Sequence, residues 1–230
     1  MNATPACVLL SGGMDSTALL HHVVRERNHS AVHALSFDYG QRHSREIECA
    51  VWQAHAAGIA SHRVIDISFF GALAGAGTTL VKEGGAVPAL TSLDAAQLDQ
   101  PPTYVPNRNM MLLSMAAAFA EAHGARDVYY GAQAQDEYGY WDCTAGFIAR
   151  LNHVLALNRR EAVTVCAPFV TLRKAASLRV GLDLGVNYSK TWSCYRGGDV
   201  ACGTCPTCVE RLNAFRELGE KDPLAYEKQT

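Results

Sequence analysis

The amino-acid sequence predicts an α/β protein: a parallel sheet of about five strands flanked by helices, followed by a small C-terminal lobe. Short apolar runs typical of buried strands alternate with segments of helical period along most of the 230-residue chain. Strands that alternate with helices pair in parallel, and the helices cover the two faces of the sheet. Four cysteines then lie close together near the C-terminus. We therefore expect one core domain over residues 1–190 and a lobe over residues 191–230 that packs on it.

The first third of the chain carries the clearest alternation of strands and helices. Residues 6–10 read Ala-Cys-Val-Leu-Leu, an apolar run that ends just before a glycine pair. Residues 16–27 then place apolar side chains at helical spacing, so a strand, a tight loop and a helix are predicted. By the same patterns, strands are expected at 32–37 and 62–67 and a helix at 45–57.

The second half repeats the alternation after a long irregular stretch. Residues 71–102 are rich in Gly, Ala, Thr and Pro, with only a weak helical tendency at 93–98. A connection of this length inside a compact domain is typical of a lid or an insertion, and we expect a flexible one here. Helices are then expected at 109–123, 147–157 and 174–184, and strands at 127–130 and 163–165.

Composition and charge narrow the functional classes. Hydrophobic residues make up 49% of the chain and charged residues 18%, which supplies a sizeable core and argues against disorder. The formal net charge is −2, so no overall positive field would attract nucleic acid or an anionic membrane. The apolar run at 7–10 is too short for a signal peptide or a membrane span. We expect a cytoplasmic protein with a small polar substrate and neither a membrane nor a nucleic-acid partner.

The segment between the first expected strand and helix has the composition of a phosphate-binding loop. It reads Ser-Gly-Gly-Met-Asp-Ser-Thr over residues 11–17. Glycines let main-chain N–H groups approach phosphate oxygens at the positive end of the helix, and the hydroxyl groups add donors. The lysine of a Walker loop is absent, so the pattern predicts a different class of ATP site. Asp15 either holds Mg²⁺ or caps the helix.

The C-terminal cysteines have the spacing of a metal site. Cys194, Cys202, Cys205 and Cys208 form the pattern C-x₇-C-x₂-C-x₂-C, with glycine and proline residues between them. Two-residue gaps let neighbouring thiolates face one ion, and four sulfur ligands leave no position open for a substrate. The pattern therefore predicts a structural Zn²⁺ site. A redox-active CxxC pair is the competing interpretation.

The phosphate loop resembles that of the ATP pyrophosphatase family, also called the PP-loop family, on the residues Ser-Gly-Gly-x-Asp-Ser at 11–16. The resemblance implies a HUP-type fold, binding of ATP with Mg²⁺, cleavage between the α and β phosphates, and an acyl-adenylate product. Asp38 joins the site because it follows the second expected strand, at the sheet edge where ligands of open α/β sheets bind. The residues expected to bind ATP are Leu10, Ser11, Gly12, Gly13, Met14, Asp15, Ser16, Thr17, Ala18, Leu19, Leu20 and Asp38.

Further segments resemble the 7-cyano-7-deazaguanine synthase family over nearly the whole chain. They are Ser-Phe-Asp-Tyr-Gly-Gln-Arg-His at 36–43, Tyr-Val-Pro-Asn-Arg-Asn at 104–109, Thr-Trp-Ser-Cys-Tyr at 191–195, and the cysteine segment with Arg211 after it. The resemblance implies that ATP adenylates the carboxylate of 7-carboxy-7-deazaguanine and that ammonia displaces the nucleotide to give an amide. A second activation then removes the amide oxygen and leaves a nitrile. Homodimers are common in this family, so a homodimer is expected.

Charged and planar donor side chains supply the expected catalytic and substrate-binding groups. Asp15, Arg108 and Lys174 are expected to be catalytic, with Lys174 offering a point charge to the departing pyrophosphate and Arg108 a planar donor. The substrate is expected to contact Tyr39, Gln41, Arg42, Arg108, Asp136, Tyr140, Trp141 and Asp142. A solvated surface position is the competing interpretation for the cationic residues among these.

The segment expected to recognise the base departs from the resembled family. The family pattern reads Asp-Tyr/Phe-Ser-Gly-Tyr-Pro-Asp-Cys-Arg, whereas four of these positions hold Glu137, Tyr138, Trp141 and Thr144 in this chain. The remaining carboxylates and tyrosine still suit a deazaguanine, but the charge and shape of the pocket differ. Two hypotheses therefore stay open: the adenylated carboxylate meets ammonia, or it is attacked by another amine such as a protein N-terminus.

A third hypothesis is a tRNA-modifying enzyme, since some PP-loop relatives act on tRNA. The slightly acidic net charge counts against this hypothesis, because proteins that bind nucleic acid usually carry a basic surface. Arg211 and Arg216, on the last expected helix, are interpreted as surface charges.

Overall fold

The computed structural model describes residues 3–42, 44–81, 84–94, 97, 100–134 and 139–227 of the chain. Half of the weak helix expected at 93–98 therefore lies outside the described residues. Within these ranges, five parallel strands form one sheet in the order β3-β2-β1-β4-β5. They are β1 (Ala6–Leu9), β2 (Val32–Asp38), β3 (Ser61–Asp66), β4 (Asp127–Tyr129) and β5 (Thr164–Cys166). The predicted parallel sheet is confirmed.

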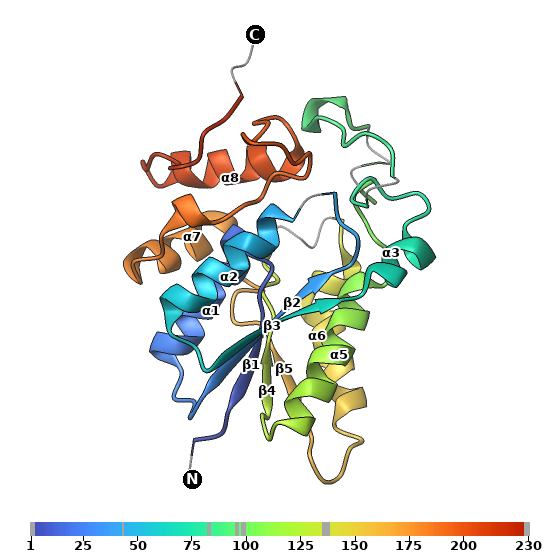
Figure 1. Cartoon of the computed structure of the whole chain (residues 1–230), viewed down its shortest axis with the longest axis vertical. Coiled ribbons are helices and arrows are strands. Elements are labelled where there is room, and N and C mark those ends of the chain that lie inside the picture. Colours follow the sequence, from blue (N-terminus) through green and yellow to red (C-terminus); the bar gives the residue numbers. More distant parts are fainter. Residues whose placement is uncertain are drawn as a thin grey trace.

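The fold has three layers, with the sheet between two layers of helices (Figure 1). One face carries α1 (Met14–Glu26), α2 (Arg45–Ala57) and α7 (Lys174–Asp183), and the other carries α5 (Arg108–Ala122) and α6 (Ala145–Leu155). Alternate side chains of a strand point to opposite faces, so β1 serves two cores. Its Cys7 and Leu9 belong to the core with Leu113 of α5. Its Val8 belongs to the core with Leu19 of α1.

The stretch 71–102 contains regular structure that its composition did not predict. A short helix, α3 (Ser68–Ala74), runs into it, and a 3₁₀ turn, η1 (Leu90–Ser92), lies within it. Gly71 lets α3 pack closely on the core, because a Cβ at this position would lie 2.3 Å from the carbonyl oxygen of Tyr39. The role of the stretch as a lid stays a prediction.

The segment after α7 lies beyond the carboxyl edge of the sheet, where α8 (Pro206–Glu217) packs against α7 (Figure 1). The interpretation of Arg211 as a surface charge is wrong. Arg211 is only 1% exposed, because its guanidinium forms a buried ion pair with Asp222. Arg216 is exposed, as expected. The division of the chain at residue 190 stays a prediction.

Across the described residues, none of the helices combines the length and the apolar character needed to cross a lipid bilayer.

Candidate active site

The phosphate loop connects β1 to α1 at the carboxyl edge of the sheet (Figure 1). Its two serines brace the turn: the Ser11 Oγ lies 2.9 Å from the Ser16 Oγ and accepts a hydrogen bond from the Gly13 N–H at 3.2 Å. The Ser11 N–H donates to the Ser16 Oγ, also at 3.2 Å. These contacts fix hydroxyl and main-chain groups at the positive end of α1, which is an arrangement suited to binding phosphate.

Gly12 is the position in this loop that tolerates no side chain. Its φ is +86°, and a Cβ there would lie 2.0 Å from the carbonyl oxygen of Glu46 in α2. On its other side, the Gly12 carbonyl oxygen accepts a hydrogen bond from the Trp192 N–H at 3.0 Å. The loop is therefore held between α2 and the C-terminal segment.

A cluster of charges lies at the start of α1. The Lys174 Nζ lies 2.8 Å from the Glu210 Oε2 and 3.6 Å from the Asp15 Oδ2. Burial raises the pKa of Asp15, and the nearby Lys174 opposes this shift. The Asp15 Oδ1 is buried and has no hydrogen-bond partner among the described residues. A carboxylate oxygen of this kind beside a phosphate loop is a suitable ligand for Mg²⁺, so the residues fit the cation expected with ATP.

A cavity of about 380 Å³ adjoins the phosphate loop. Its walls come from the loop itself, from the first turns of α2 and α5, and from the segments that follow β2 and β4. The C-terminal segment and residues between 90 and 103 complete the lining. Tyr39, Tyr140 and Tyr195 contribute aromatic rings to these walls, and Arg108 contributes a positive charge. Apolar walls with a few polar groups are the usual form of a small-molecule site.

Arg108 lines the cavity from the first turn of α5. The preceding Asn107 has a φ of +54°, a left-handed conformation that asparagine tolerates better than most residues. The Arg108 Nη1 lies 3.4 Å from the Tyr39 hydroxyl, and the Arg108 Nε donates to the Asn109 Oδ1 at 3.2 Å. The guanidinium is thereby held in place. A planar guanidinium can bind a carboxylate through two parallel hydrogen bonds.

The cavity also contains a carboxylate that the sequence analysis did not single out. Glu46 lies in the first turn of α2 and lines the cavity. Burial raises the pKa of Glu46 to about 7, and Arg108 acts in the opposite direction. The available signal was its position at the start of an expected helix, shortly after the segment 36–43 that carries the family resemblance.

The other residues predicted for the site fall into several groups, and their roles stay predictions. Those that line the cavity are Leu10, Ser11, Gly13, Met14, Asp15, Ser16, Tyr39, Gln41, Arg108, Tyr140 and Lys174. Those buried in α1 behind the loop are Thr17, Ala18, Leu19 and Leu20. Those that do not line the cavity also include Gly12, Asp38, Arg42, Trp141 and Asp142. Asp136 lies outside the described residues, as do His43, Glu137 and Tyr138.

Three of the residues that do not line the cavity have protein partners. The Asp38 Oδ1 accepts a hydrogen bond from the Gly40 N–H at 3.1 Å. The Arg42 guanidinium donates to the carbonyl oxygens of Thr79, Gly84 and Gly85, and so fastens the stretch 71–102 to the core. Trp141 is 47% exposed, and its indole N–H donates to the Tyr104 hydroxyl at 2.8 Å.

Asp142 lies in the 3₁₀ turn η3 (Trp141–Cys143), between the cavity residues Tyr140 and Cys143 in the sequence. It is 1% exposed, and its Oδ1 accepts a hydrogen bond from the Asn109 Nδ2 at 3.1 Å. Burial raises the pKa of Asp142. The Asp142 Oδ2 is buried and has no hydrogen-bond partner within the described ranges. A spare acceptor in this position suits a ligand that presents N–H donors.

The four cysteines predicted as metal ligands come together in one buried cluster. Their Sγ atoms all lie within 4.8 Å of one another, and the Cys202 and Cys208 Sγ atoms are 3.9 Å apart. Four sulfurs bound at about 2.3 Å to one tetrahedral ion lie roughly 3.8 Å apart, so the cluster fits Zn²⁺. The Cys202 N–H donates to the Cys194 Sγ at 3.4 Å, and the Cys205 N–H donates to the Cys202 Sγ at 3.3 Å. Hydrogen bonds of this kind stabilise the charge of a thiolate.

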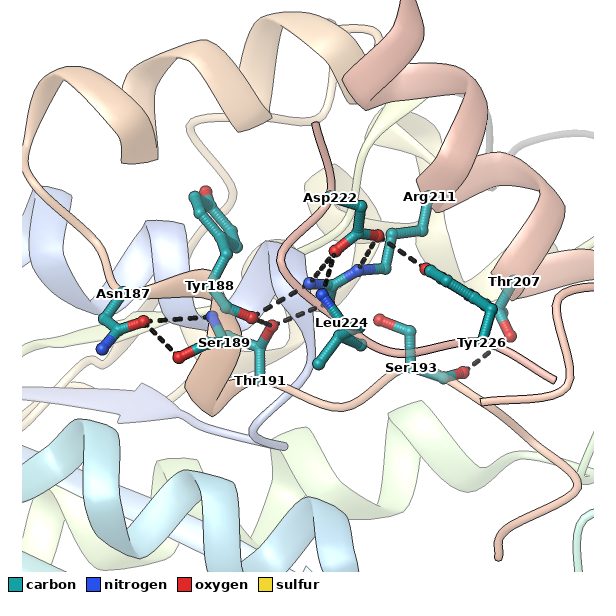
Figure 2. Close-up of polar contacts among 10 residues, drawn as sticks. All are labelled: Asn187, Tyr188, Ser189, Thr191, Ser193, Thr207, Arg211, Asp222, Leu224 and Tyr226. Carbon is teal, nitrogen blue, oxygen red and sulfur yellow. Dashed lines mark hydrogen bonds and ion pairs between the residues drawn. The ribbon is translucent and has the colours of Figure 1, made fainter. Parts of the chain in front are cut away.

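A buried ion pair between Arg211 and Asp222 joins α8 to the segment that follows it (Figure 2). The Arg211 Nε and Nη2 donate to the two carboxylate oxygens of Asp222 at 2.7 and 3.0 Å. The same guanidinium donates to the Thr191 Oγ1 at 2.7 Å and to the Tyr188 carbonyl oxygen at 3.0 Å. Thr191 immediately precedes Trp192, whose N–H holds the loop, so the ion pair fixes the residue next to that contact.

The fold and the site together define the PP-loop class of ATP-using enzymes: a parallel sheet with a phosphate loop that lacks the Walker lysine and borders a cavity. NMN synthetase from Francisella tularensis has a similar fold, with a TM-score of 0.51, 16% identity and coverage of 95% of this chain and 79% of that one. The U34-tRNA thiolase NcsA from Methanococcus maripaludis also has a TM-score of 0.51, with 16% identity and coverage of 85% and 62%. At such identities the likeness shows the fold alone.

The sequence comparisons are more specific. The family model described as Queuosine biosynthesis protein QueC matches residues 5–219. The 7-cyano-7-deazaguanine synthase of Caldicellulosiruptor bescii is 45% identical over 222 residues, which cover 96% of this chain and 97% of that protein. The protein of the same name from Psychromonas ingrahamii is 44% identical over 225 residues, with 96% of each chain covered. The chain belongs to the QueC family, and the resemblance drawn from its motifs is confirmed.

Proposed function

We propose that this chain is an ATP-dependent carbon–nitrogen ligase that converts 7-carboxy-7-deazaguanine to 7-cyano-7-deazaguanine with ammonia. The observation that carries the proposal is the cavity shared by the phosphate loop and Arg108. One side of it suits a triphosphate and the other suits a carboxylate, and adenylation requires these two groups to be held side by side. Membership of the QueC family, with relatives named 7-cyano-7-deazaguanine synthase, supports the identity of the carboxylate and favours nitrile formation over the two alternative hypotheses.

On the nucleotide side, the loop N–H groups and the hydroxyls of Ser11 and Ser16 hold the β and γ phosphates. Asp15 would hold Mg²⁺, which supplies neutralising charge to phosphate oxygens when it is bound. Lys174 lies beside Asp15 and stabilises the charge of the departing pyrophosphate. Because the substrate carboxylate is itself the nucleophile, positioning and electrostatic stabilisation are sufficient for the adenylation step.

On the substrate side, Arg108 binds the carboxylate in the orientation needed for attack on the α phosphate. The rings of Tyr39 and Tyr140 offer faces on which the deazaguanine base stacks. The spare acceptor of Asp142 suits the N–H groups of the base. Gln41, which lines the cavity and accepts a hydrogen bond from the Tyr39 N–H at 2.9 Å, keeps the Tyr39 segment in position.

We propose Zn²⁺ as the occupant of the cysteine cluster, in a structural role. The sulfur spacing supports this assignment, whereas each cysteine of a 4Fe-4S cluster binds a different iron, so the sulfurs lie farther apart than the 3.9 Å between Cys202 and Cys208. Elemental analysis should find one zinc per chain, with no iron and no visible absorption. Reduced thiolates of this kind belong to a reducing compartment, which supports a cytoplasmic location. Light scattering tests the expected homodimer.

The function is tested with purified protein, Mg²⁺, ATP, 7-carboxy-7-deazaguanine and ammonium. Mass spectrometry should detect the nitrile. Asp15→Ala is expected to abolish ATP turnover with an unchanged circular dichroism spectrum, whereas Asp183→Ala, which changes an exposed aspartate of α7, should leave turnover intact. Wild-type turnover by Asp15→Ala would refute the ATP site. Amide or adenylate that accumulates without nitrile would favour a different amine acceptor, and salt-dependent retention of tRNA on filters would favour the RNA-modifying hypothesis.

A further inference from the structure

The proposed reaction assigns no role to the carboxylate of Glu46, which is one of the side chains that line the cavity. Its main chain packs directly on the phosphate loop, since the Glu46 carbonyl oxygen occupies the space beside Gly12. Its side chain lines the same cavity as the loop and Arg108. Within the described part of the chain, neither a hydrogen bond nor an ion pair engages the Glu46 carboxylate. Glu46 is half-buried, and carboxylates withdrawn from solvent are normally hydrogen-bonded or paired when they serve only the fold.

The charged and titratable groups around Glu46 come from several elements. Arg108 at the start of α5 favours the ionised form, and Tyr39 after β2 and Tyr195 in the C-terminal segment interact with it electrostatically. On its own helix, Cys49 interacts with Glu46 in the same way. Burial outweighs the effect of Arg108 and raises the pKa of Glu46 to about 7. A carboxylate in this range accepts and releases protons efficiently near neutral pH.

We infer that Glu46 is the catalytic base that takes a proton from ammonium for attack on the acyl-adenylate. The inference rests on the proposed function, which requires ammonia to react at the carbonyl carbon beside the phosphate loop. Ammonium is the dominant form of ammonia at neutral pH and has no lone pair with which to attack. The cavity therefore needs a group that binds the cation and removes one proton. Glu46 is a carboxylate that lines the cavity, and its side chain has no hydrogen-bond or ion-pair partner among the residues that the structure describes.

The step balances without an additional reactant. Ammonium transfers one proton to the Glu46 carboxylate and becomes ammonia, whose lone pair forms a bond to the carbonyl carbon. The bond between that carbon and the AMP phosphate oxygen breaks, and AMP leaves with the electron pair. The nitrogen loses a second proton to water, which leaves the primary amide, and Glu46 returns its own proton to solvent before the next cycle.

The test separates adenylation from amine transfer. Exchange of labelled pyrophosphate into ATP, dependent on 7-carboxy-7-deazaguanine and measured without ammonium, reports adenylation alone. Glu46→Gln should keep this exchange within about threefold of wild type, while amide formation with ammonium falls by about 10²-fold or more. Hydroxylamine is largely unprotonated at neutral pH and needs no base, so its conversion to the hydroxamate should survive in Glu46→Gln. Glu48→Gln, which changes an exposed glutamate on the same helix, is the matched control.

Each outcome decides between the alternatives. If Glu46→Gln lowers the rates with ammonium and with hydroxylamine equally, Glu46 is not the base. If the variant loses pyrophosphate exchange, Glu46 is a substrate-binding residue and not the base. Glu46→Asp retains a carboxylate and should recover part of the ammonium-dependent rate. If Glu46→Gln fails to fold, the wild-type pH profiles decide. The ammonium rate should rise with pH and level off above the titration of Glu46 at about 7, whereas the hydroxylamine rate should not change through this range. An ammonium rate that keeps rising in proportion to free ammonia would overturn the role of Glu46 as a base. Absence of substrate-dependent exchange in wild type would refute the proposed function itself.

Discussion

Removal of the Asp222 carboxylate is expected to destabilise the protein far more than removal of a surface carboxylate. Asp222→Ala leaves the Arg211 guanidinium, which is 1% exposed, without its charge partner. The variant loses two hydrogen bonds of 2.7 and 3.0 Å between these side chains (Figure 2). It also loses the hydrogen bond that Tyr226 donates to the Asp222 Oδ2 at 2.6 Å. Among the described residues, Asp222 supplies the one carboxylate that is hydrogen-bonded to Arg211. The buried positive charge of Arg211 is therefore left without a paired negative charge in the variant.

The magnitude follows from the burial of both partners. Breaking a buried ion pair by removing one partner costs about 3–5 kcal/mol. For a protein of this length each kcal/mol lowers Tm by about 2–4 °C, so Asp222→Ala should lower Tm by about 6–20 °C. Asp183, which lies 4.0 Å from Arg179 and is 67% exposed, forms the corresponding surface pair. Asp183→Ala should change the free energy of unfolding by less than about 1 kcal/mol.

Urea denaturation followed by circular dichroism measures both free energies of unfolding under the same conditions. ATP affinity, measured by calorimetry below the melting range of the variant, should also fall in Asp222→Ala, because Arg211 holds the residue before Trp192. If Asp222→Ala and Asp183→Ala lose the same small amount of stability, the ion pair contributes nothing beyond a surface contact. The reasoning from burial would then be refuted.

Three further outcomes follow from the structure. Gly12→Ala should lower ATP affinity, measured by calorimetry, at least about tenfold, because φ at this position is +86° and the new Cβ would collide with α2. The control Gly58→Ala, at φ +67° with open space around the new Cβ, should leave ATP affinity unchanged. Cys205→Ser should contain no bound metal by elemental analysis and should unfold at a lower temperature than wild type. Cys166→Ser, which changes a cysteine outside the cluster, should keep the metal. Full metal content in Cys205→Ser would disprove the metal site. Burial raises the pKa of Glu46 from 4.5 to about 7, so the folded state binds this proton more tightly and wild-type stability decreases as pH rises between these values. Glu46→Gln should therefore be more stable than wild type above pH 7, by up to about 3 kcal/mol, and a constant difference from pH 4 to pH 8 would contradict this.

The sheet was predictable because its strands are short apolar runs that alternate with helical periods. The helix α3 was not predicted, because a seven-residue segment with a glycine in its middle gives too short a helical pattern. Its position depends on the close approach of Gly71 to Tyr39, which no local pattern encodes. The burial of Arg211 was missed for a related reason: an arginine on a mixed helix is usually exposed, and its partner Asp222 lies in an irregular segment after the helix.

The phosphate loop and the cysteine cluster were predictable because their ligands lie close together in the sequence. The cavity was only partly predictable, because its walls come from segments that are distant in the sequence. Local patterns do not show whether a side chain of such a segment lines the cavity or packs elsewhere. Arg42 is an example, since it belongs to the segment 36–43 that carries the family resemblance, yet its guanidinium donates to carbonyl oxygens of the stretch 71–102. Glu46 illustrates the opposite case, because nothing local distinguishes it from the exposed Glu48 two residues later.

The clamp between Gly12 and Trp192 has a consequence for biosynthesis. A ribosome makes the phosphate loop well before it makes Trp192, so the proposed nucleotide site should reach its full affinity only when the segment around Trp192 has emerged and docked. Fragments that end before residue 192, made by premature termination or by proteolysis, should not bind ATP tightly and would therefore not sequester it.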